Sequence, residues 1–203
     1  MALAVVAEHS FGMMFSGGVF AVQLFFVISG FYISYILIEA QSYHSVRTFY
    51  ENRFLRLYPL YWIVALGSLT MYGGAALLTG NPPAFIEVYQ QTDTTGFIAL
   101  ALSNVLLIGQ DWIIFTAIND GVFHLTADYY QSDIFTWRGL LVPPAWSLGV
   151  EITFYLIAPF ILPRLRLLFV LLGLSIALRL WLISIGIGLD DPWNYRFFPT
   201  ELA

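Results

Sequence analysis

The stretch Gly18–Ile38, GVFAVQLFFVISGFYISYILI, decides the class of fold. Its one strongly polar side chain is Gln23, and it is as long as the about 20 apolar residues that a transmembrane helix needs. The whole chain has the same character, because 59% of its 203 residues are hydrophobic and only 10% are charged. In soluble domains about 45–50% of residues are apolar and about 25% are charged. We therefore expect an integral membrane protein.

Charge and cysteine content exclude other classes of protein. The net charge of −5 and the absence of a basic cluster argue against a nucleic-acid-binding module, so no nucleic-acid partner is expected. The low charge also argues against a disordered chain. Because the sequence has no cysteine, it can form neither a disulfide nor a cysteine acyl-enzyme. All eight basic residues are arginine, so any anion must be bound by guanidinium, histidine or a helix terminus.

The hydrophobic segments predict an all-α fold, a polytopic bundle of transmembrane helices with about five full spans. The first apolar segment, near Met1–Phe15, is too short to span alone, because as one helix it measures about 22 Å against a bilayer core of about 30 Å, so we expect the chain to start inside a helix. A further segment, Phe97–Ala117, carries polar residues and is treated separately below. The other expected spans are Gly18–Ile38, Leu57–Thr79, Ala145–Leu162 and Leu167–Ile187.

The arginines predict how the chain is oriented in the membrane. The loop 39–56 and the turn at Arg164 and Arg166 should both be cytoplasmic. Three hydrophobic segments lie between them, and three crossings would place the two arginine-rich regions on opposite sides. We therefore expect Phe97–Ala117 to be re-entrant, since its polar end, Gln110-Asp111, is poorly suited to lipid. The alternative is a normal span that violates the charge rule once.

The first cluster that could carry chemistry is Glu8-His9-Ser10. Histidine is the side chain best placed to accept a proton near neutral pH. The predicted orientation puts His9 close to the non-cytoplasmic face. The alternative is an interfacial histidine that only ends a helix.

The second cluster is Arg53 and Arg56, which are three residues apart and so share a helical face. Two guanidinium groups at the cytoplasmic interface could bind phosphates with paired hydrogen bonds. The alternative is that they serve only to keep their loop in the cytoplasm. They precede Pro59, which we expect in the first turn of the next helix.

The third cluster is Trp146-Ser147-Leu148-Gly149-Val150-Glu151. Ser147 and Glu151 are four residues apart and lie on one helical face. A carboxylate inside a span is costly and needs a partner, so Glu151 could orient a histidine or contact a hydroxyl substrate. The alternative is a structural ion pair between Glu151 and an intramembrane arginine such as Arg179, which could also pair with Asp111. The three histidines of the chain form no metal-binding motif, and no metal site is expected.

These blocks together resemble the acyltransferase-3 family of integral-membrane O-acyltransferases. The resemblance depends on five blocks in the right order and spacing and covers nearly the whole chain. The blocks are AVVAEHSFG, FFVISGFYIS, FYENRFLRLYPLYW, PPAWSLGVEITFYLIAPFIL and NYRFFPTELA.

The resemblance implies transfer of an acyl group, usually acetyl, from acyl-CoA to a hydroxyl of a carbohydrate or cell-envelope glycan. Acyl-CoA would be the donor substrate, and no cofactor would be bound permanently. The expected setting is a multi-pass protein of the bacterial inner membrane. The residues that the resemblance implies are His9 and Glu151 as catalytic, and Arg53, Arg56, Trp146 and Ser147 as donor- or substrate-binding.

Two features depart from the family pattern. Its usual arginine, about three helical turns before the histidine, is missing, because only eight residues precede His9. The family also has about ten spans. We therefore expect residues 1–203 to be a partial acyltransferase-3 transmembrane domain, its N-terminal half, with a truncated first helix and the later helices missing. The competing interpretations are a fragment of a solute or proton transporter and a non-catalytic remnant of the family.

Overall fold

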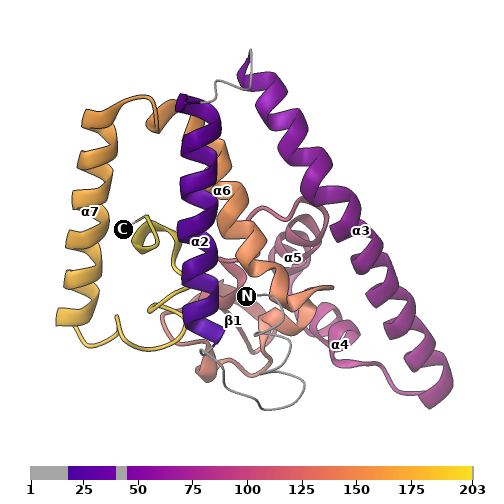
Figure 1. Ribbon diagram of the computed structural model, residues 1–203. Coiled ribbons are helices and arrows are strands. Elements are labelled where there is room, and N and C mark those ends of the chain that lie inside the picture. The colour runs from indigo at the N-terminus through magenta and orange to yellow at the C-terminus, as the bar shows by residue number, and fades with distance from the viewer. Residues whose placement is uncertain (1–17, 40–44, 203) are drawn as a thin grey trace. The chain divides into compact units, whose positions relative to one another are not determined.

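A computed structural model describes residues 18–39 and 45–202 (Figure 1). The described residues are mostly helical, as the all-α prediction requires, and contain two short strands. The helices are α2 (Gly18–Ser34, followed by a π-helical turn, Tyr35–Glu39), α3 (Val46–Thr79), α4 (Ala84–Gln91), α5 (Thr94–Leu106), α6 (Trp146–Ile161) and α7 (Leu165–Ser184). The strands are β1 (Thr116–Asn119) and β2 (Val122–Leu125). Five 3₁₀ turns complete the set: Ile113–Phe115, Tyr129–Gln131, Thr136–Gly139, Pro143–Ala145 and Phe198–Thr200.

Four helical stretches in the described residues are long and apolar enough to cross a membrane. They confirm the prediction of a polytopic membrane protein. The expected first span, near Met1–Phe15, lies outside the described residues. The four stretches are Gly18–Glu39, Val46–Thr79, Pro143–Ile161 and Leu165–Ser184.

The chain divides into two compact units. One consists of Glu51–Ile152, and the other of the described residues up to Tyr50 and from Thr153 onward. The long helices α3 and α6 each contribute to both units. The predicted site residues 53, 56 and 146–151 all belong to the first unit. We describe each unit by itself.

Helix α3 is longer than expected. It has 34 residues, about 50 Å, and runs without a break through Pro59, so our expectation that this proline opens a new helix is wrong. A proline inside a helix costs one backbone hydrogen bond. Two tyrosine side chains next to Pro59 donate hydrogen bonds to carbonyls of α5. Tyr58 Oη donates to Leu106 O at 2.5 Å, and Tyr61 Oη donates to Asn104 O at 2.7 Å.

Helix α5 has only 13 residues, about 20 Å, and is too short to cross the bilayer core. It ends where Leu107 adopts a left-handed conformation, with φ of 60°, and the chain continues into a turn, a 3₁₀ turn and β1. Phe97–Ala117 is therefore not the continuous span of the alternative prediction. The last carbonyls of α5 accept hydrogen bonds from α3, with Trp62 Nε1 donating to Val105 O at 3.2 Å beside the two tyrosine contacts. This arrangement lets a helix end away from water.

The segment between α5 and α6 packs on α4 and α5. Strands β1 and β2 form an antiparallel hairpin in which Thr116 lies opposite Leu125. Gly139 lies so close to α4 and α5 that a Cβ there would be 3.0 Å from the side chains of Val88 and Leu100. Buried residues from all these elements form one apolar core: Val88, Leu100, Ile113, Ile118 and Leu140.

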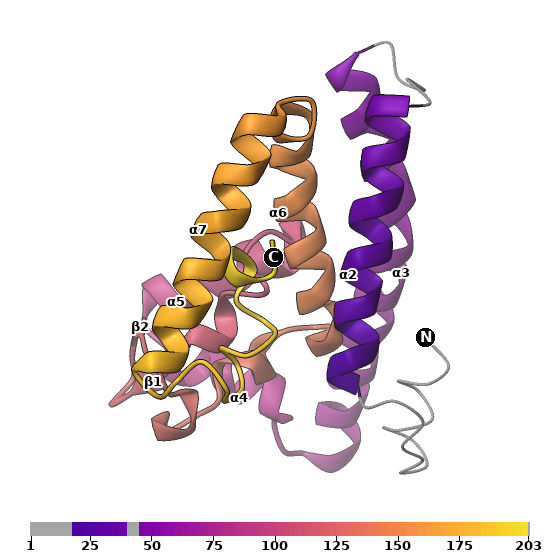
Figure 2. The same cartoon turned by 60° about the vertical axis from the view of Figure 1, so that its left-hand side comes forward.

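In the other unit, α7 lies beside the C-terminal half of α6, and the chain after α7 folds back along it (Figures 1 and 2). Arg179 of α7 pairs with Glu201 of that tail, with Nη2 and Oε1 2.5 Å apart. The alternative interpretation paired Arg179 with Glu151 or Asp111. In the structure Arg179 pairs with Glu201 instead. Burial raises the pKa of Glu201, whereas Arg179 lowers it.

Candidate functional site

His9 lies outside the described residues, so its catalytic role stays a prediction. The other predicted site residues belong to the unit Glu51–Ile152. Two of them, Arg53 and Arg56, come from α3, and the rest come from the start of α6.

Arg53 and Arg56 lie one helical turn apart but in different environments. Arg53 is buried, with 7% of its surface exposed, whereas Arg56 is exposed. Within the described residues Arg56 makes no ion pair, so its guanidinium is open to a ligand. The sequence predicted the shared helical face but not this difference in burial.

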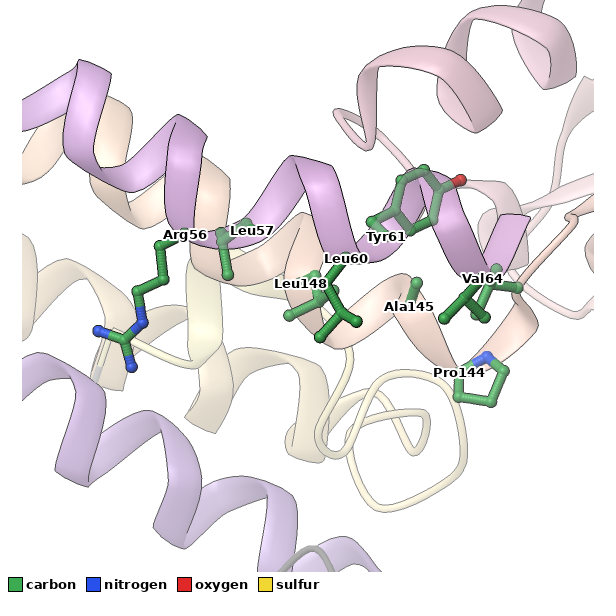
Figure 3. Close-up of a pocket in the computed structure, with 9 residues that line it drawn as sticks. Arg56, Leu57, Leu60, Tyr61, Val64, Pro144, Ala145 and Leu148 are labelled. Atoms are coloured by element: carbon green, nitrogen blue, oxygen red, sulfur yellow. The ribbon is translucent and has the colours of Figure 1, made fainter. Parts of the chain in front are cut away.

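An apolar groove of about 300 Å³ begins at Arg56. Its size is at the lower end of the range for small-molecule pockets. Figure 3 shows Arg56 at one end of the row of lining side chains and Pro144 at the other. Apart from Arg56 and the hydroxyl of Tyr61, the lining side chains are aliphatic: Leu57, Leu60 and Val64 from α3, and Val142, Pro144, Ala145 and Leu148 from the start of α6 and the turn before it.

The order of the lining residues shows that α3 and the start of α6 run in opposite directions. Leu148 lies near Leu60, while Pro144, earlier in the chain, lies near Val64, later in α3 (Figure 3). Within this unit the start of α6 therefore runs antiparallel to α3.

The Trp146–Glu151 block forms the first turns of α6. The 3₁₀ turn Pro143–Ala145 leads into it, and Ser147 Oγ donates back to Pro144 O at 3.3 Å. Trp146 and Ser147 are half-buried, and Glu151 is buried with 6% of its surface exposed. The structure thus brings the block and the groove together through Ala145 and Leu148, as the sequence alone could not show.

A buried polar network lies beside the groove and was not predicted as part of the site. Asn104 Nδ2 donates to Tyr89 Oη at 2.9 Å and to Gly139 O at 2.8 Å, and its Oδ1 accepts from Leu141 N at 2.7 Å. Gln110 Nε2 donates to Tyr61 Oη at 2.8 Å. The sequence signal for this network is the cluster of polar residues in an apolar segment. That cluster predicted the topology of the segment but not its place beside the groove.

Asp111, next to Gln110, is 1% exposed. Its Oδ1 atom has no hydrogen-bond partner among the described residues. Burial raises the pKa of Asp111 to about 7, although backbone N–H groups of Asp111 and Trp112 lower it. A carboxyl group with such a pKa is in part protonated at neutral pH.

No group of three or more histidine, cysteine, aspartate or glutamate side chains within residues 18–39 and 45–202 could hold a metal ion. The polar groups that line the groove are the guanidinium of Arg56 and the hydroxyl of Tyr61, next to an apolar surface. Such a set suits a ligand with an anionic end and an apolar arm.

Comparison with known proteins gives two curated relatives. The chain is 27% identical over 207 residues to the peptidoglycan O-acetyltransferase OatA of Listeria monocytogenes serovar 1/2a, which covers 94% of this chain but 29% of that protein. It is 31% identical over 149 residues to protein 2 in the picA locus of Rhizobium radiobacter, which covers 72% of this chain and 67% of that protein. No solved structure is significantly similar.

The chain therefore spans less than a third of the length of the Listeria enzyme. Its match to the family is much more extensive. Residues 2–199 match the acyltransferase domain that defines the acyltransferase-3 family. This match confirms the resemblance found in the sequence blocks, and the chain belongs to the acyltransferase-3 family of membrane acyltransferases.

Proposed function

We propose that this protein is an O-acyltransferase of the bacterial inner membrane that moves an acyl group, acetyl in the simplest case, from acyl-CoA to a hydroxyl of a cell-envelope glycan. The observation that carries the proposal is the apolar groove with the exposed guanidinium of Arg56 at one end. Membership of the acyltransferase-3 family supports it as well.

The groove matches the chemistry of acyl-CoA as a donor. The donor has phosphates at one end and a flexible arm with the acyl thioester at the other. Arg56 can bind a phosphate with two hydrogen bonds, and the aliphatic lining accepts the arm. From Arg56 to Val64 the groove follows α3 for about 12 Å. Arg53, buried one turn earlier, adds a second positive charge near the same end.

The chemical step we propose uses His9 as a general base. His9 takes the proton from the acceptor hydroxyl as its oxygen attacks the thioester carbonyl carbon. The new ester bond forms, the carbon–sulfur bond breaks, and the thiolate of CoA leaves and takes up a proton. Glu151 orients either His9 or the acceptor, as carboxylates do for catalytic histidines. No cysteine is present to form an acyl-enzyme.

A glycan acceptor is supported by the name of the Listeria relative, a peptidoglycan O-acetyltransferase. Peptidoglycan, other envelope polysaccharides and small glycosides all offer the hydroxyl that the step needs. The membership of an acyltransferase family disfavours the transporter interpretation.

The donor site can be tested by acetyl transfer from labelled acetyl-CoA in proteoliposomes that contain the full chain and a glycan acceptor. Arg56→Gln should raise the KM for acetyl-CoA by about tenfold or more, because a charged phosphate contact is lost. Arg164→Gln is the matched control, since Arg164 is an exposed arginine whose guanidinium contacts only the backbone of Phe160 in the described structure. An unchanged KM in Arg56→Gln would remove the groove from donor binding.

The acid–base role is tested by His9→Ala, which should reduce transfer by at least about a hundredfold at normal expression. Unimpaired transfer in this variant would exclude His9 from the mechanism. A wild-type chain that is folded, inserted and inactive toward every acyl-CoA and acceptor offered would support the remnant interpretation instead.

A further inference from the structure

The turn that follows α5 packs directly against α6 at Gly149. A Cβ atom on Gly149 would lie 3.0 Å from Asp111 Oδ1, 3.2 Å from Asp111 N and 3.2 Å from Leu107 O. Two of these atoms belong to the backbone and cannot move independently of the turn. Gly149 is buried, so the space cannot open toward lipid or water. Only glycine allows the turn and α6 to approach this closely.

The same turn is held on its other side by the wall of the groove. Gln110 Nε2 donates to Tyr61 Oη at 2.8 Å and to Ser103 O at 3.1 Å. Tyr61 lines the groove, and its hydroxyl donates in turn to Asn104 O at 2.7 Å. The turn thus links the groove wall on α3 with the start of α6.

Asp111 is an unusual residue to find at this contact. Its side chain is buried against Gly149, and its Oδ1 atom has no hydrogen-bond partner among the described residues. An unsatisfied buried oxygen costs about 1–3 kcal/mol, so a residue serving only to fill the space would be better replaced by an apolar one. A cost of this kind at a single buried group points to a role in function.

We propose that Asp111 is a positioning residue for acyl transfer: its carboxyl group, held by the Gln110–Tyr61 contact and pressed against Gly149, fixes the Trp146–Glu151 segment relative to the donor groove. The inference rests on the proposed function, since it assigns Glu151 to the reacting centre. Asp111 acts through α6 and does not touch the substrate.

The helix transmits the contact to Glu151 because the distance is short. Glu151 follows Gly149 by two residues, about 3 Å along the helix axis. A helix moves as a rigid element over this length, so a displacement at Gly149 displaces Glu151 by a similar amount. A misplacement of about 1 Å can reduce the rate of a positioned reaction by about a hundredfold.

The first test compares Gly149→Ala with Gly67→Ala, in the full chain in proteoliposomes, by the acetyl-transfer assay. A Cβ at Gly67 meets no atom within 4 Å, so Gly67→Ala is the matched control for a methyl group on a helix. Gly149→Ala should lower kcat by about tenfold or more, with the KM for acetyl-CoA changed by less than about threefold. Equal kcat values in the two variants would overturn the positioning role.

The second test varies Asp111 itself, and it decides the matter if Gly149→Ala does not fold. Asp111→Asn keeps the shape of the carboxyl group and should keep kcat within about threefold at pH 6. Asp111→Ala removes the contact and should lower kcat by about tenfold, per folded molecule. In the double variant Gly149→Ala with Asp111→Ala, part of the loss should be recovered because the nearest atom is gone. Equal kcat in Asp111→Ala and Asp111→Asn would overturn the proposal.

A third measurement separates failure of this inference from failure of the proposed function. Hydrogen exchange of the backbone amides of residues 146–152 reports packing without any need for activity. Gly149→Ala and Asp111→Ala should speed their exchange, whereas Gly67→Ala should not. If the wild type transfers no acyl group, the proposed function falls, and the positioning role with it. If the wild type is active and exchange in the segment is the same in all variants, the positioning role falls alone.

Discussion

Two buried carboxyl groups in this protein lie in opposite environments. Glu201, in the tail after α7, is 6% exposed at its side chain and is paired with Arg179. Asp111, in the turn after α5, is 1% exposed, and its carboxyl has an oxygen without a hydrogen-bond partner among the described residues. Burial raises the pKa of both groups, but only at Glu201 does an arginine lower it again.

The difference separates a stabilising contact from a costly one. Glu201 has a structural partner, because its ion pair with Arg179 holds the tail on α7, and removal of one partner of such a pair is destabilising. A buried carboxyl without a cation is destabilising whenever it is ionised, so its presence at the contact between Gly149 and the groove wall needs a functional reason. Substitutions that remove the two carboxyl groups should therefore change the free energy of unfolding in opposite directions.

The largest change in stability is expected for Asp111→Asn at alkaline pH. The pKa of Asp111 is raised from 3.8 to about 7, so the folded state binds more protons than the unfolded state between these values. The stability of the wild type therefore falls as the pH rises from about 4 to about 7 and is constant above. Asparagine does not titrate, so the variant should gain up to about 4 kcal/mol over the wild type at pH 8 and lose that advantage at pH 4.

Thermal unfolding in detergent micelles at pH 4, 6 and 8 measures this effect. Asp93→Asn is a suitable control, because Asp93 is an N-cap residue outside the turn and asparagine caps a helix equally well. A difference between Asp111→Asn and the wild type that does not grow with pH would show that Asp111 does not carry the buried charge.

Glu201→Ala should lower the stability of the protein, whereas Asp111→Asn should raise it. Removal of the carboxylate leaves the guanidinium of Arg179 without its ion-pair partner, and within residues 18–39 and 45–202 it keeps a hydrogen bond to Asn194 O at 3.4 Å. Breaking a fully buried pair costs about 3–5 kcal/mol, but the Arg179 side chain is 34% exposed and can reach water or a headgroup. We expect a loss of about 2 kcal/mol in thermal unfolding at neutral pH. The double variant with Arg179→Ala should be less destabilised than the sum of the single variants, and a purely additive result would argue against the pair.

The sequence was enough to predict the class of fold but not all of the helix boundaries. The long apolar segments correctly predicted a polytopic helical protein, because apolar length is what the bilayer selects. Pro59 was wrongly predicted to open a helix, because nothing local in the sequence shows that α3 continues through it. Gln110-Asp111 correctly predicted that Phe97–Ala117 would not cross as one helix, because polar groups at membrane depth must be shielded by protein.

The site was predicted less completely. The Arg53–Arg56 spacing and the Trp146–Glu151 block were visible as motifs, but the groove that Arg56 shares with Leu148 depends on how α3 packs against the start of α6. The partner of Arg179 was not predicted, because Glu201 lies in a polar tail whose path back along α7 leaves no periodic signal. The role of Gly149 was also invisible, since only the structure shows what a Cβ there would meet.

The smallest effect is expected for Tyr61→Phe, which asks whether the turn carrying Asp111 depends on the groove wall. The change removes one hydroxyl that donates to Asn104 O and accepts from Gln110 Nε2. Gln110 keeps its bond to Ser103 O, so we expect a loss of only about 1 kcal/mol in stability. Hydrogen exchange of residues 107–112 should nevertheless become faster, because the turn loses a side-chain bond to α3. If exchange in this turn is unchanged while stability falls, Tyr61 stabilises α5 alone, and Asp111 must be held against Gly149 by the backbone of the turn.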